Sequence, residues 1–134
     1  PGPALREVRR RFLLGVGMPG DLLDAIACGV DLFDCVLPTR NGRNGTAFTE
    51  EGRLILHNAA FARDERPIEP GCDCPGCTRF SRGYLRHLLR EGELLGLTMV
   101  SLHNLHFYNR FLERCRRAIG DGRFEAFRRS CPDY

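Results

Sequence analysis

Lysine is absent from this chain of 134 residues, so all 20 basic side chains are arginines. The planar guanidinium fork suits phosphate groups better than an ammonium does, although a chain without lysine also arises from GC-rich coding. The net charge of +3 is too small to indicate a nucleic-acid-binding protein by itself. No apolar run approaches the roughly 20 residues that a membrane-spanning helix needs. The sequence therefore predicts a soluble protein with no membrane partner.

We expect no secretory leader, and the chain begins Pro1-Gly2-Pro3 without methionine. We expect a processed chain or one cut from a longer protein. Its length suits one domain, and its hydrophobic content of 43% is ordinary for a globular protein. The expected lack of a leader, together with thiols that are expected to bind metal, favours a reducing compartment, most simply the cytoplasm.

Three of the seven cysteines stand close together in the segment Cys72-Asp73-Cys74-Pro75-Gly76-Cys77. Thiols with this spacing, and with a Pro-Gly pair predicted to form a turn, can converge on one point and leave room for one further ligand. Thiolates with an imidazole nitrogen match the tetrahedral preference of Zn2+, and a site with four protein ligands is structural. Disulfides are disfavoured, because seven is an odd number and the C-x-C-x-x-C spacing is poor for pairing.

Spacing alone leaves the fourth metal ligand open. The candidates are His57, His87, His103, His106 and the carboxylate of Asp73. His103 is expected in the first turn of a helix that starts near Ser101, and from there its ring could reach back to the thiols. This position favours it over a histidine in the middle of a helix, such as His87.

A βαβ unit is predicted near the N-terminus, after a basic amphipathic helix that is expected to end within residues 4–11. Residues 12–17 and 30–36 are short apolar runs typical of strands buried on both faces, and a helix is expected between them. A right-handed crossover places the carboxyl ends of both strands at one edge, where parallel α/β proteins carry their active groups. Asp34 lies at this edge and is a candidate for chemistry. From the residues alone, an aspartate that accepts loop amides or caps a turn is the more frequent case.

The next segment, residues 39–45, contains two Asn-Gly pairs and is predicted to be a loop with tight turns. Arg40 and Arg43 lie on this loop, which leaves the same edge as Asp34. Such a loop could bind an anion. A solvated connection explains the same composition equally well.

Hairpin strands with a three-residue turn are expected at 46–56, a short helix at 58–61 and an extended segment at 67–70. A helix is predicted at 79–90, with arginines along one outer stripe that could follow a phosphate backbone or simply face solvent. The residues of this stripe are Arg79, Arg82, Arg86 and Arg90.

The last long helix is expected to run from near Ser101 to Gly120, followed by a short helix around Phe124 and Phe127. Its apolar seam would consist of Leu105, Tyr108, Leu112, Cys115 and Ile119. The cysteines outside the metal segment are expected to be ordinary core thiols. They are Cys28, Cys35, Cys115 and Cys131.

Several of these motifs occur in the same order in one known family. They are Gly15-Val16-Gly17, the run DLFDCVLPTRNGRNG at residues 31–45, Cys72-Asp73-Cys74-x-x-Cys77, Ser81-Arg82-x-Tyr84-Leu85-Arg86-His87-Leu88 and His103-Asn104-Leu105. Through them, residues 10–115 resemble the C-terminal part of a tRNA-guanine transglycosylase (queuine tRNA-ribosyltransferase).

The resemblance implies a fold of the α/β class, namely the C-terminal portion of a (β/α)8 TIM barrel with a zinc-binding subdomain. Residues 1–45 would form the last βα units with the catalytic strand and the anticodon-binding loop. Residues 46–110 would form the zinc-binding subdomain, and residues 111–134 a C-terminal helical segment. Because the chain can supply about two of the eight βα units of such a barrel, we expect it to be inactive alone.

The resemblance also implies an activity. The family exchanges the guanine at the wobble position of certain tRNAs for a 7-deazaguanine, preQ1 or queuine, in queuosine biosynthesis. By resemblance, Asp34 is the nucleophile, Leu14 and Gly15 bind the base, and Arg40 and Arg43 contact the tRNA anticodon loop. One structural Zn2+ is assigned to Cys72, Cys74, Cys77 and His103. A homodimer, or an assembly with a close homologue, is expected in the cytoplasm.

Three other functions fit parts of the sequence. A non-catalytic zinc module could bind RNA through the arginine stripe, and a purely structural element could dimerise through the zinc subdomain. A non-catalytic partner subunit of a eukaryotic transglycosylase would share the zinc motif. Such a subunit is not expected to keep the nucleophile, so the presence of Asp34, Arg40 and Arg43 disfavours it.

Overall fold

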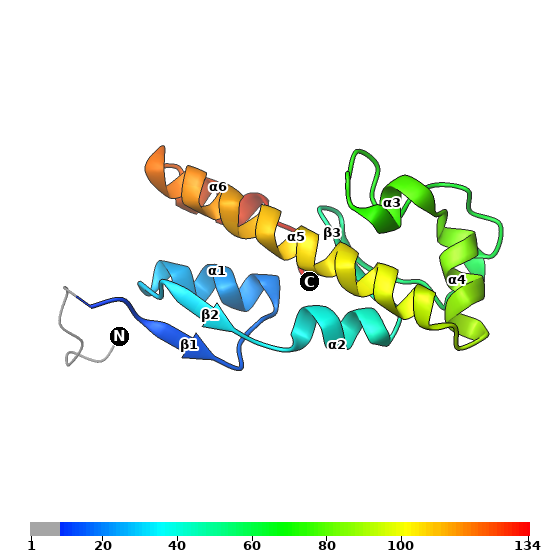
Figure 1. The fold of residues 1–134 in the computed structure, drawn as a ribbon. Coiled ribbons are helices and arrows are strands. Elements are labelled where there is room, and N and C mark those ends of the chain that lie inside the picture. Colours follow the sequence, from blue (N-terminus) through cyan, green and yellow to red (C-terminus); the bar gives the residue numbers. More distant parts are fainter. Residues whose placement is uncertain (1–8) are drawn as a thin grey trace.

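One long helix, α5 (Leu94–Gly120), runs the length of the molecule (Figure 1) and contacts other elements from the N-terminal half to the C-terminus. The structure is a computed structural model and describes residues 9–134. Helix α5 has 27 residues, and charged residues interrupt its apolar sequence. Within residues 9–134, no helix combines the length and the apolar character needed to cross a membrane.

The predicted βαβ unit is present. It consists of β1 (Phe12–Leu14), α1 (Pro19–Ala27) and β2 (Leu32–Asp34). Proline is tolerated in the first turn of a helix, and Gly29, with a φ of +86°, follows the end of α1 as expected. The two strands are parallel, and Leu14 pairs with Asp34. The carboxyl ends of both strands therefore lie at one edge.

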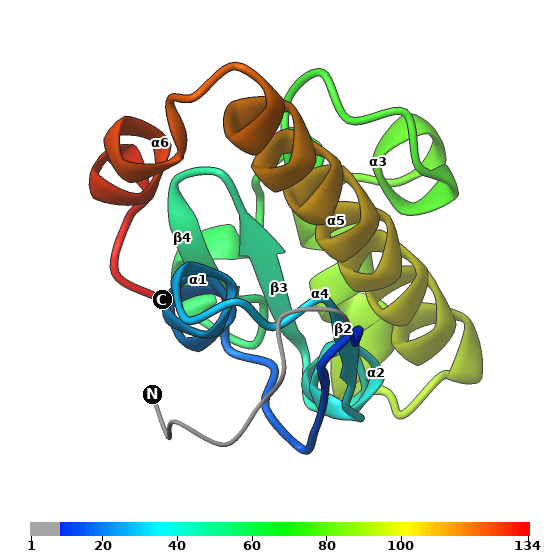
Figure 2. The same ribbon diagram turned by 90° about the vertical axis from the view of Figure 1, so that its left-hand side faces the viewer.

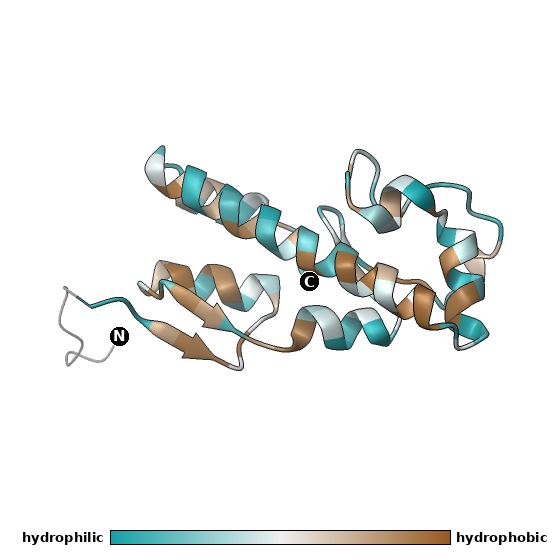
Figure 3. Cartoon of the chain, in the orientation of Figure 1, coloured by the Kyte–Doolittle hydropathy of each residue, from teal (hydrophilic) through white to brown (hydrophobic). Residues whose placement is uncertain are grey.

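The strands are shorter and more exposed than predicted. Phe12 is 59% exposed and Leu14 is 63% exposed, and Figure 3 shows both strands as apolar ribbons at the outside of the molecule. Burial on both faces is not met within residues 9–134, where only one face of the pair is covered. This agrees with the expectation that the chain alone exposes the sides of such strands and the inner face of a barrel wall. Of the predicted N-terminal helix, residues 4–8 lie outside the described part, and residues 9–11 are not helical.

A helix, α2 (Leu37–Arg43), replaces the loop predicted at residues 39–45. Its first turn accommodates Pro38, and Gly45, with a φ of +71°, follows its end. Gly42 lies against α5 so closely that a Cβ atom there would come within 2.6 Å of the Cα of Ser101. Asn41-Gly42 therefore marks a helix–helix contact and not the predicted turn. Asn44-Gly45 does form a turn at the end of α2, where the amide of Gly45 donates to the carbonyl of Gly42 at 3.0 Å.

A hairpin follows, formed by β3 (Thr46–Thr49) and β4 (Gly52–Ile55). Thr49 pairs with Gly52, so the turn has two residues and not the predicted three. Ala47 and Phe48 are both fully buried, but in two different apolar clusters. This follows from the alternation of side chains across a strand.

Four further elements follow the hairpin, in addition to α5. They are a 3-10 turn η1 (Ala59–Phe61), α3 (Pro75–Arg79), α4 (Arg82–Arg90) and α6 (Phe124–Ser130). The first and the last confirm predicted short helices. The helix predicted at 79–90 is confirmed over Arg82–Arg90, but its predicted start is wrong. Ser81 has an extended backbone and caps α4 by accepting a hydrogen bond from the amide of Tyr84.

The predicted outer stripe of arginines is also wrong. Arg79 belongs to α3, whereas Arg82 is buried, with 8% of its surface exposed. The guanidinium of Arg82 donates to the carbonyl of Ile68 at 2.8 Å and to Asp64 at 3.4 Å. A buried arginine of this kind binds the protein itself, so Arg79, Arg82, Arg86 and Arg90 form no continuous stripe toward solvent.

Two apolar clusters form the core. The cysteine-side cluster contains Ala47, Leu56, Ile68, Cys72, Cys74, Cys77, Leu85, Leu88, Leu89 and Val100. The aromatic cluster contains Leu22, Leu23, Phe48, Phe107, Tyr108, Phe111 and Cys115. Figure 2 shows the hairpin beside α5, and its residues Ala47 and Phe48 contribute to one cluster each.

Helix α5 starts at Leu94, seven residues before the predicted start at Ser101. The predicted seam is correct for Tyr108 and Cys115, but Leu105 and Ile119 are exposed. The reason is that the buried face of α5 also carries two polar residues, His103 and Asn104, which a search for apolar periodicity passes over.

Of the four predicted core thiols, Cys115 is buried, Cys35 and Cys131 are half-buried and Cys28 is exposed. The prediction is therefore wrong for Cys28. The expected boundary between residues 110 and 111 falls inside α5, and the division of the chain into three parts stays a prediction.

Candidate metal centre and exposed carboxylate

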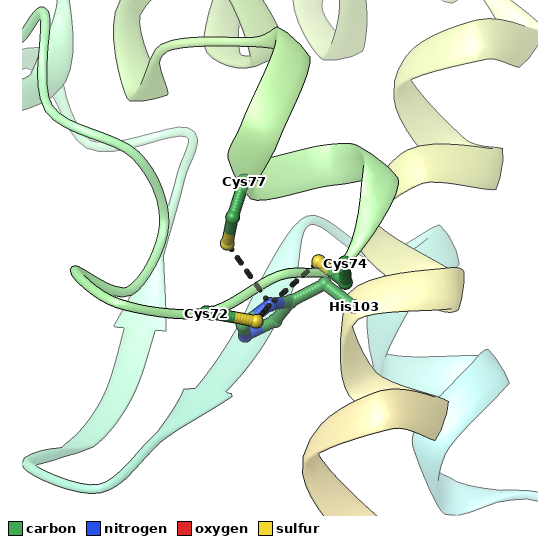
Figure 4. Close-up of side chains that lie close together, drawn as sticks. All are labelled: Cys72, Cys74, Cys77 and His103. Atoms are coloured by element: carbon green, nitrogen blue, oxygen red, sulfur yellow. Dashed lines mark hydrogen bonds between the residues drawn. The ribbon is translucent and has the colours of Figure 1, made fainter.

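Three thiols and one imidazole converge beside the middle of α5. The Nδ1 atom of His103 lies 3.7, 3.5 and 3.4 Å from the Sγ atoms of Cys72, Cys74 and Cys77 (Figure 4). All four side chains are buried, and the four atoms lie within 4.8 Å of one another. This cluster could hold a metal ion.

Local structure brings the thiols together. Cys74 directly precedes α3, Pro75 starts the helix, and the amide of Cys77 donates to the carbonyl of Cys74 at 3.0 Å. The Pro-Gly pair predicted to be a turn is thus the first turn of α3. Gly76 is pressed against α5, because a Cβ atom there would come within 2.9 Å of the carbonyl oxygen of Met99.

The orientation of His103 is set by its second nitrogen. Nε2 lies 2.8 Å from the carbonyl oxygen of Phe48 and donates a hydrogen bond to it, so the lone pair of Nδ1 faces the thiols. His103 lies well inside α5 and not in its first turn as predicted, yet it reaches the thiols because α3 packs beside this part of α5. His57 and His87 are exposed, and His106 pairs with Asp73 at 2.7 Å.

The thiols do not ionise alike. A hydrogen bond from Cys77 lowers the pKa of Cys74 to about 3, with a further contribution from His103. The same bond raises the pKa of Cys77, and burial raises the pKa of Cys72. A bound cation would be needed for all three to be thiolates at neutral pH.

A buried carboxylate ties the cysteine segment to the hairpin and to α5. Glu69 accepts a hydrogen bond from the amide of Glu50 at 2.7 Å and one from Arg110 at 3.2 Å. Its own carbonyl accepts from the amide of Cys72 at 3.2 Å. Sequence reasoning missed this residue, because a lone glutamate in a proline-rich segment gives no sign of burial.

The second group of candidate residues lies at the carboxyl edge of β1 and β2. Asp34 and Leu14 are paired, so their side chains are neighbours on the same exposed face. The amide of Gly15 donates to the carbonyl of Asp34 at 2.8 Å and extends the ladder by one bond. The structure thus brings Leu14, Gly15 and Asp34 together.

Arg40 and Arg43 are exposed in α2, the helix that follows this edge. Among residues 9–134, no hydrogen bond or ion pair engages the side chain of Asp34 or of either arginine. The carboxylate and both guanidinium groups are therefore open to a ligand, and Asp34 does not bind the arginines directly.

Two buried polar residues of α5, whose polar contacts the residue patterns did not predict, bind the segments on either side of Asp34. The amide group of Asn104 donates to the carbonyls of Pro38 and Thr46 at 2.9 Å each and accepts from the amide of Phe48 at 3.0 Å. The hydroxyl of Tyr108 donates to the carbonyl of Gly17 at 2.6 Å. Burial raises the pKa of Tyr108, so this donor keeps its proton at neutral pH. Polar side chains at positions on the apolar face of α5 could have indicated these contacts.

The fold and the site together define a class of protein. It has a parallel βαβ unit with an exposed carboxylate at its edge, joined to three cysteines and a histidine that could hold a metal ion. Residues 2–133 match the family model described as Queuine tRNA-ribosyltransferase. The chain belongs to this family, as the motifs of the sequence predicted.

Similar proteins include the queuine tRNA-ribosyltransferases of Sphingopyxis alaskensis, Herpetosiphon aurantiacus and Sorangium cellulosum, which are 57%, 54% and 51% identical to this chain. The alignments cover 90%, 93% and 96% of the chain, but only 32%, 32% and 33% of the relatives. The chain thus spans about a third of the length of the curated relatives it matches.

Proposed function

We propose that this chain is the C-terminal part of a tRNA-guanine transglycosylase, which exchanges the wobble guanine of tRNA for preQ1 or queuine in queuosine biosynthesis. Membership of the family supports the proposal. The structural observation that carries it is the carboxylate of Asp34, which stands exposed at the end of β2 beside Leu14 and Gly15.

The chemistry suits an aspartate. A carboxylate oxygen of Asp34 attacks the anomeric carbon of the ribose, and guanine leaves with the electrons of the glycosidic bond. The departed guanine takes up a proton from water. A nitrogen of the incoming base then attacks the same carbon, releases its N–H proton to water and displaces the carboxylate. Two inversions give net retention. A carboxylate, unlike the hydroxyl of a serine, needs no activating base to act as a nucleophile.

The neighbouring residues supply binding. The target base must leave the anticodon stack to be reached, so the enzyme has to hold the adjoining nucleotides. We assign this role to Arg40 and Arg43, whose guanidinium groups are exposed on α2. Leu14 forms the floor of the base pocket, and the amide of Gly15 holds the backbone of Asp34 in place.

We assign one structural Zn2+ to Cys72, Cys74, Cys77 and His103. In a tetrahedral zinc site, bond lengths of about 2.3 Å to sulfur and 2.0–2.1 Å to nitrogen place the two ligand atoms about 3.6 Å apart. The three sulfur–nitrogen distances, 3.4–3.7 Å, agree with this value. The hydrogen bond from His103 to Phe48 supplies the outer contact that metal-bound histidines usually make.

The βαβ unit is proposed to be part of a (β/α)8 barrel. Its apolar strands have one uncovered face and each has an unpaired edge within residues 9–134, as expected of two neighbouring strands of a larger parallel sheet. We also propose a cytoplasmic homodimer that uses the surface around the cysteines. The exposed ring of Tyr84, stacked on Phe80 at a centroid distance of 5.6 Å, supports such a contact.

Asp34→Asn in the full-length enzyme that carries this chain tests the proposal. The enzyme is incubated with tRNA and labelled guanine, and both base exchange and the covalent protein–tRNA adduct on a denaturing gel are measured. We expect the variant to lose on the order of a thousandfold or more in exchange and to form no adduct, because the nucleophile is gone. Asp21→Asn, at an exposed aspartate of α1, is the matched control and should exchange normally.

An Asp34→Asn variant that exchanges guanine like the wild type would overturn the proposal. Binding of tRNA by a wild-type protein that never forms an adduct would instead favour the non-catalytic zinc module.

A further inference from the structure

The side chains of Asn104 and Tyr108 project from the same face of α5, because they are four residues apart. Between them they reach both backbone segments that flank Asp34. Tyr108 contacts the segment after β1, and Asn104 contacts the segment after β2. Neither side chain is exposed, so neither can touch a substrate directly.

Asn104 spans the two ends of α2. One of its N–H groups donates to Pro38 in the first turn, and the other donates to Thr46, just beyond the last turn. Its oxygen accepts from Phe48, so both donors and the acceptor of this amide are used. Asp34 lies four residues before Pro38, and Arg40 and Arg43 lie between the two carbonyls. Asn104 therefore ties both ends of α2 to α5, in addition to the close contact of Gly42 with Ser101.

Tyr108 holds the other flank. Its hydroxyl binds the carbonyl of Gly17, and two residues earlier the amide of Gly15 binds the carbonyl of Asp34. Gly17 also packs tightly against Cys35, the residue after Asp34. A Cβ atom at Gly17 would overlap the Cys35 sulfur. The ring of Tyr108 packs edge-on against Phe48, so its packing and its hydroxyl can be separated by substitution.

We propose that Asn104 and Tyr108 are positioning residues of the base-exchange reaction, which hold the carboxylate of Asp34 and the two α2 arginines in register with each other. The inference rests on the proposed transglycosylase function. Tyr108 acts on the nucleophile through the Gly15–Gly17 segment, and Asn104 acts on both the nucleophile and the RNA-binding helix. Reactions of this kind depend on placement, and a shift of about 1 Å can cost a hundredfold in rate.

The test uses the metal-loaded full-length enzyme that carries this chain and measures kcat, KM for tRNA and the rate of adduct formation. Tyr108→Phe keeps the ring and should lower kcat and the adduct rate about tenfold, with KM for tRNA within about twofold, because α2 is still held. Asn104→Leu should lower kcat and also raise KM several-fold, because the arginines shift together with the carboxylate.

Matched controls come from the same part of the molecule. Tyr134→Phe removes a hydroxyl from the same aromatic group, and Asn109→Leu removes an amide from the exposed side of α5. Both should leave kcat and KM unchanged. Should Asn104→Leu fail to fold, Tyr108→Phe still decides the matter, since its packing is intact.

The outcomes separate the two proposals. A wild-type enzyme that forms no adduct would overturn the transglycosylase function itself. An active wild type together with a Tyr108→Phe variant of normal kcat and adduct rate, whatever its melting temperature, would overturn the positioning role alone.

Discussion

His103 donates its Nε2 hydrogen to the carbonyl of Phe48 over 2.8 Å, while its other nitrogen faces three thiols. One imidazole therefore connects the cysteine segment to the hairpin and to the middle of α5. A metal ion bound at the thiols would act on the whole C-terminal half through this ring.

Metal removal is therefore expected to destabilise the protein. Zn2+ should be present at one equivalent per chain. A structural metal contributes several kcal/mol to the free energy of unfolding, and the loss of each kcal/mol lowers the melting temperature by roughly 3–6 °C in a domain of this size. A chelator should therefore lower the melting temperature by about 10 °C or more. Circular dichroism and metal analysis measure both effects, and added Zn2+ should restore the transition. Cys77→Ser should mimic the chelator, and the control Cys28→Ser, at an exposed thiol, should not. A melting curve indifferent to the chelator would exclude a structural metal.

Gly42→Ala should destabilise the contact between α2 and α5. The added Cβ would lie 2.6 Å from the Cα of Ser101, so one helix must shift, at a cost of about 1–3 kcal/mol. Urea unfolding gives the free-energy change. Gly120→Ala places the same methyl where nothing lies within 4 Å and should be neutral or slightly stabilising. Equal effects of the two substitutions would contradict the close contact.

Arg82→Met should cost about 2–3 kcal/mol in the free energy of unfolding, because the carbonyl of Ile68 loses its donor and buried Asp64 loses one of its two cations. Arg79→Met and Arg90→Met, at exposed positions, should each change stability by less than about 0.5 kcal/mol. Denaturant titration distinguishes these values. If all three substitutions changed the free energy of unfolding by the same small amount, the interpretation of a solvent-facing arginine stripe would be supported again.

The stability of the protein should also depend on Asp64 in acid. A hydrogen bond from Arg66 is the main cause that holds the pKa of Asp64 well below its usual range, and the charge of Arg82 adds to it. A lowered pKa in the folded state stabilises the protein above the unfolded pKa, near 3.8, and this contribution is lost as the pH falls below it. The stability difference between wild type and Asp64→Asn should thus shrink from pH 6 to pH 3. Comparing the two at each pH cancels effects of acid on the metal ligands, and a constant difference would count against this ion pair.

Local patterns predicted much of this structure. The βαβ unit follows from two apolar runs around an amphipathic helix, and the hairpin follows from two alternating segments, so both are visible in neighbouring residues. The cysteine spacing predicted three of the four converging side chains for the same reason. The histidine was different, because spacing left several candidates and only the resemblance to a family selected His103.

Several of the errors come from contact between distant segments. Asn41-Gly42 has the composition of a tight turn, but the missing side chain of Gly42 serves the approach of α5. Arg82 looked like a surface residue because its partners, Asp64 and Ile68, lie far upstream. The exposure of β1 and β2 could not be read from their composition, since apolar strands predict a covering layer without saying which residues supply it.

The alternation along β3 has a practical consequence. Ala47 belongs to the cysteine-side cluster and the next residue, Phe48, to the aromatic cluster, so two cores share one strand. Cutting the chain on either side of the hairpin would remove from one cluster the β3 residue that packs in it. The two halves should accordingly melt as a single unit, and neither could be transplanted into another protein without carrying this strand along.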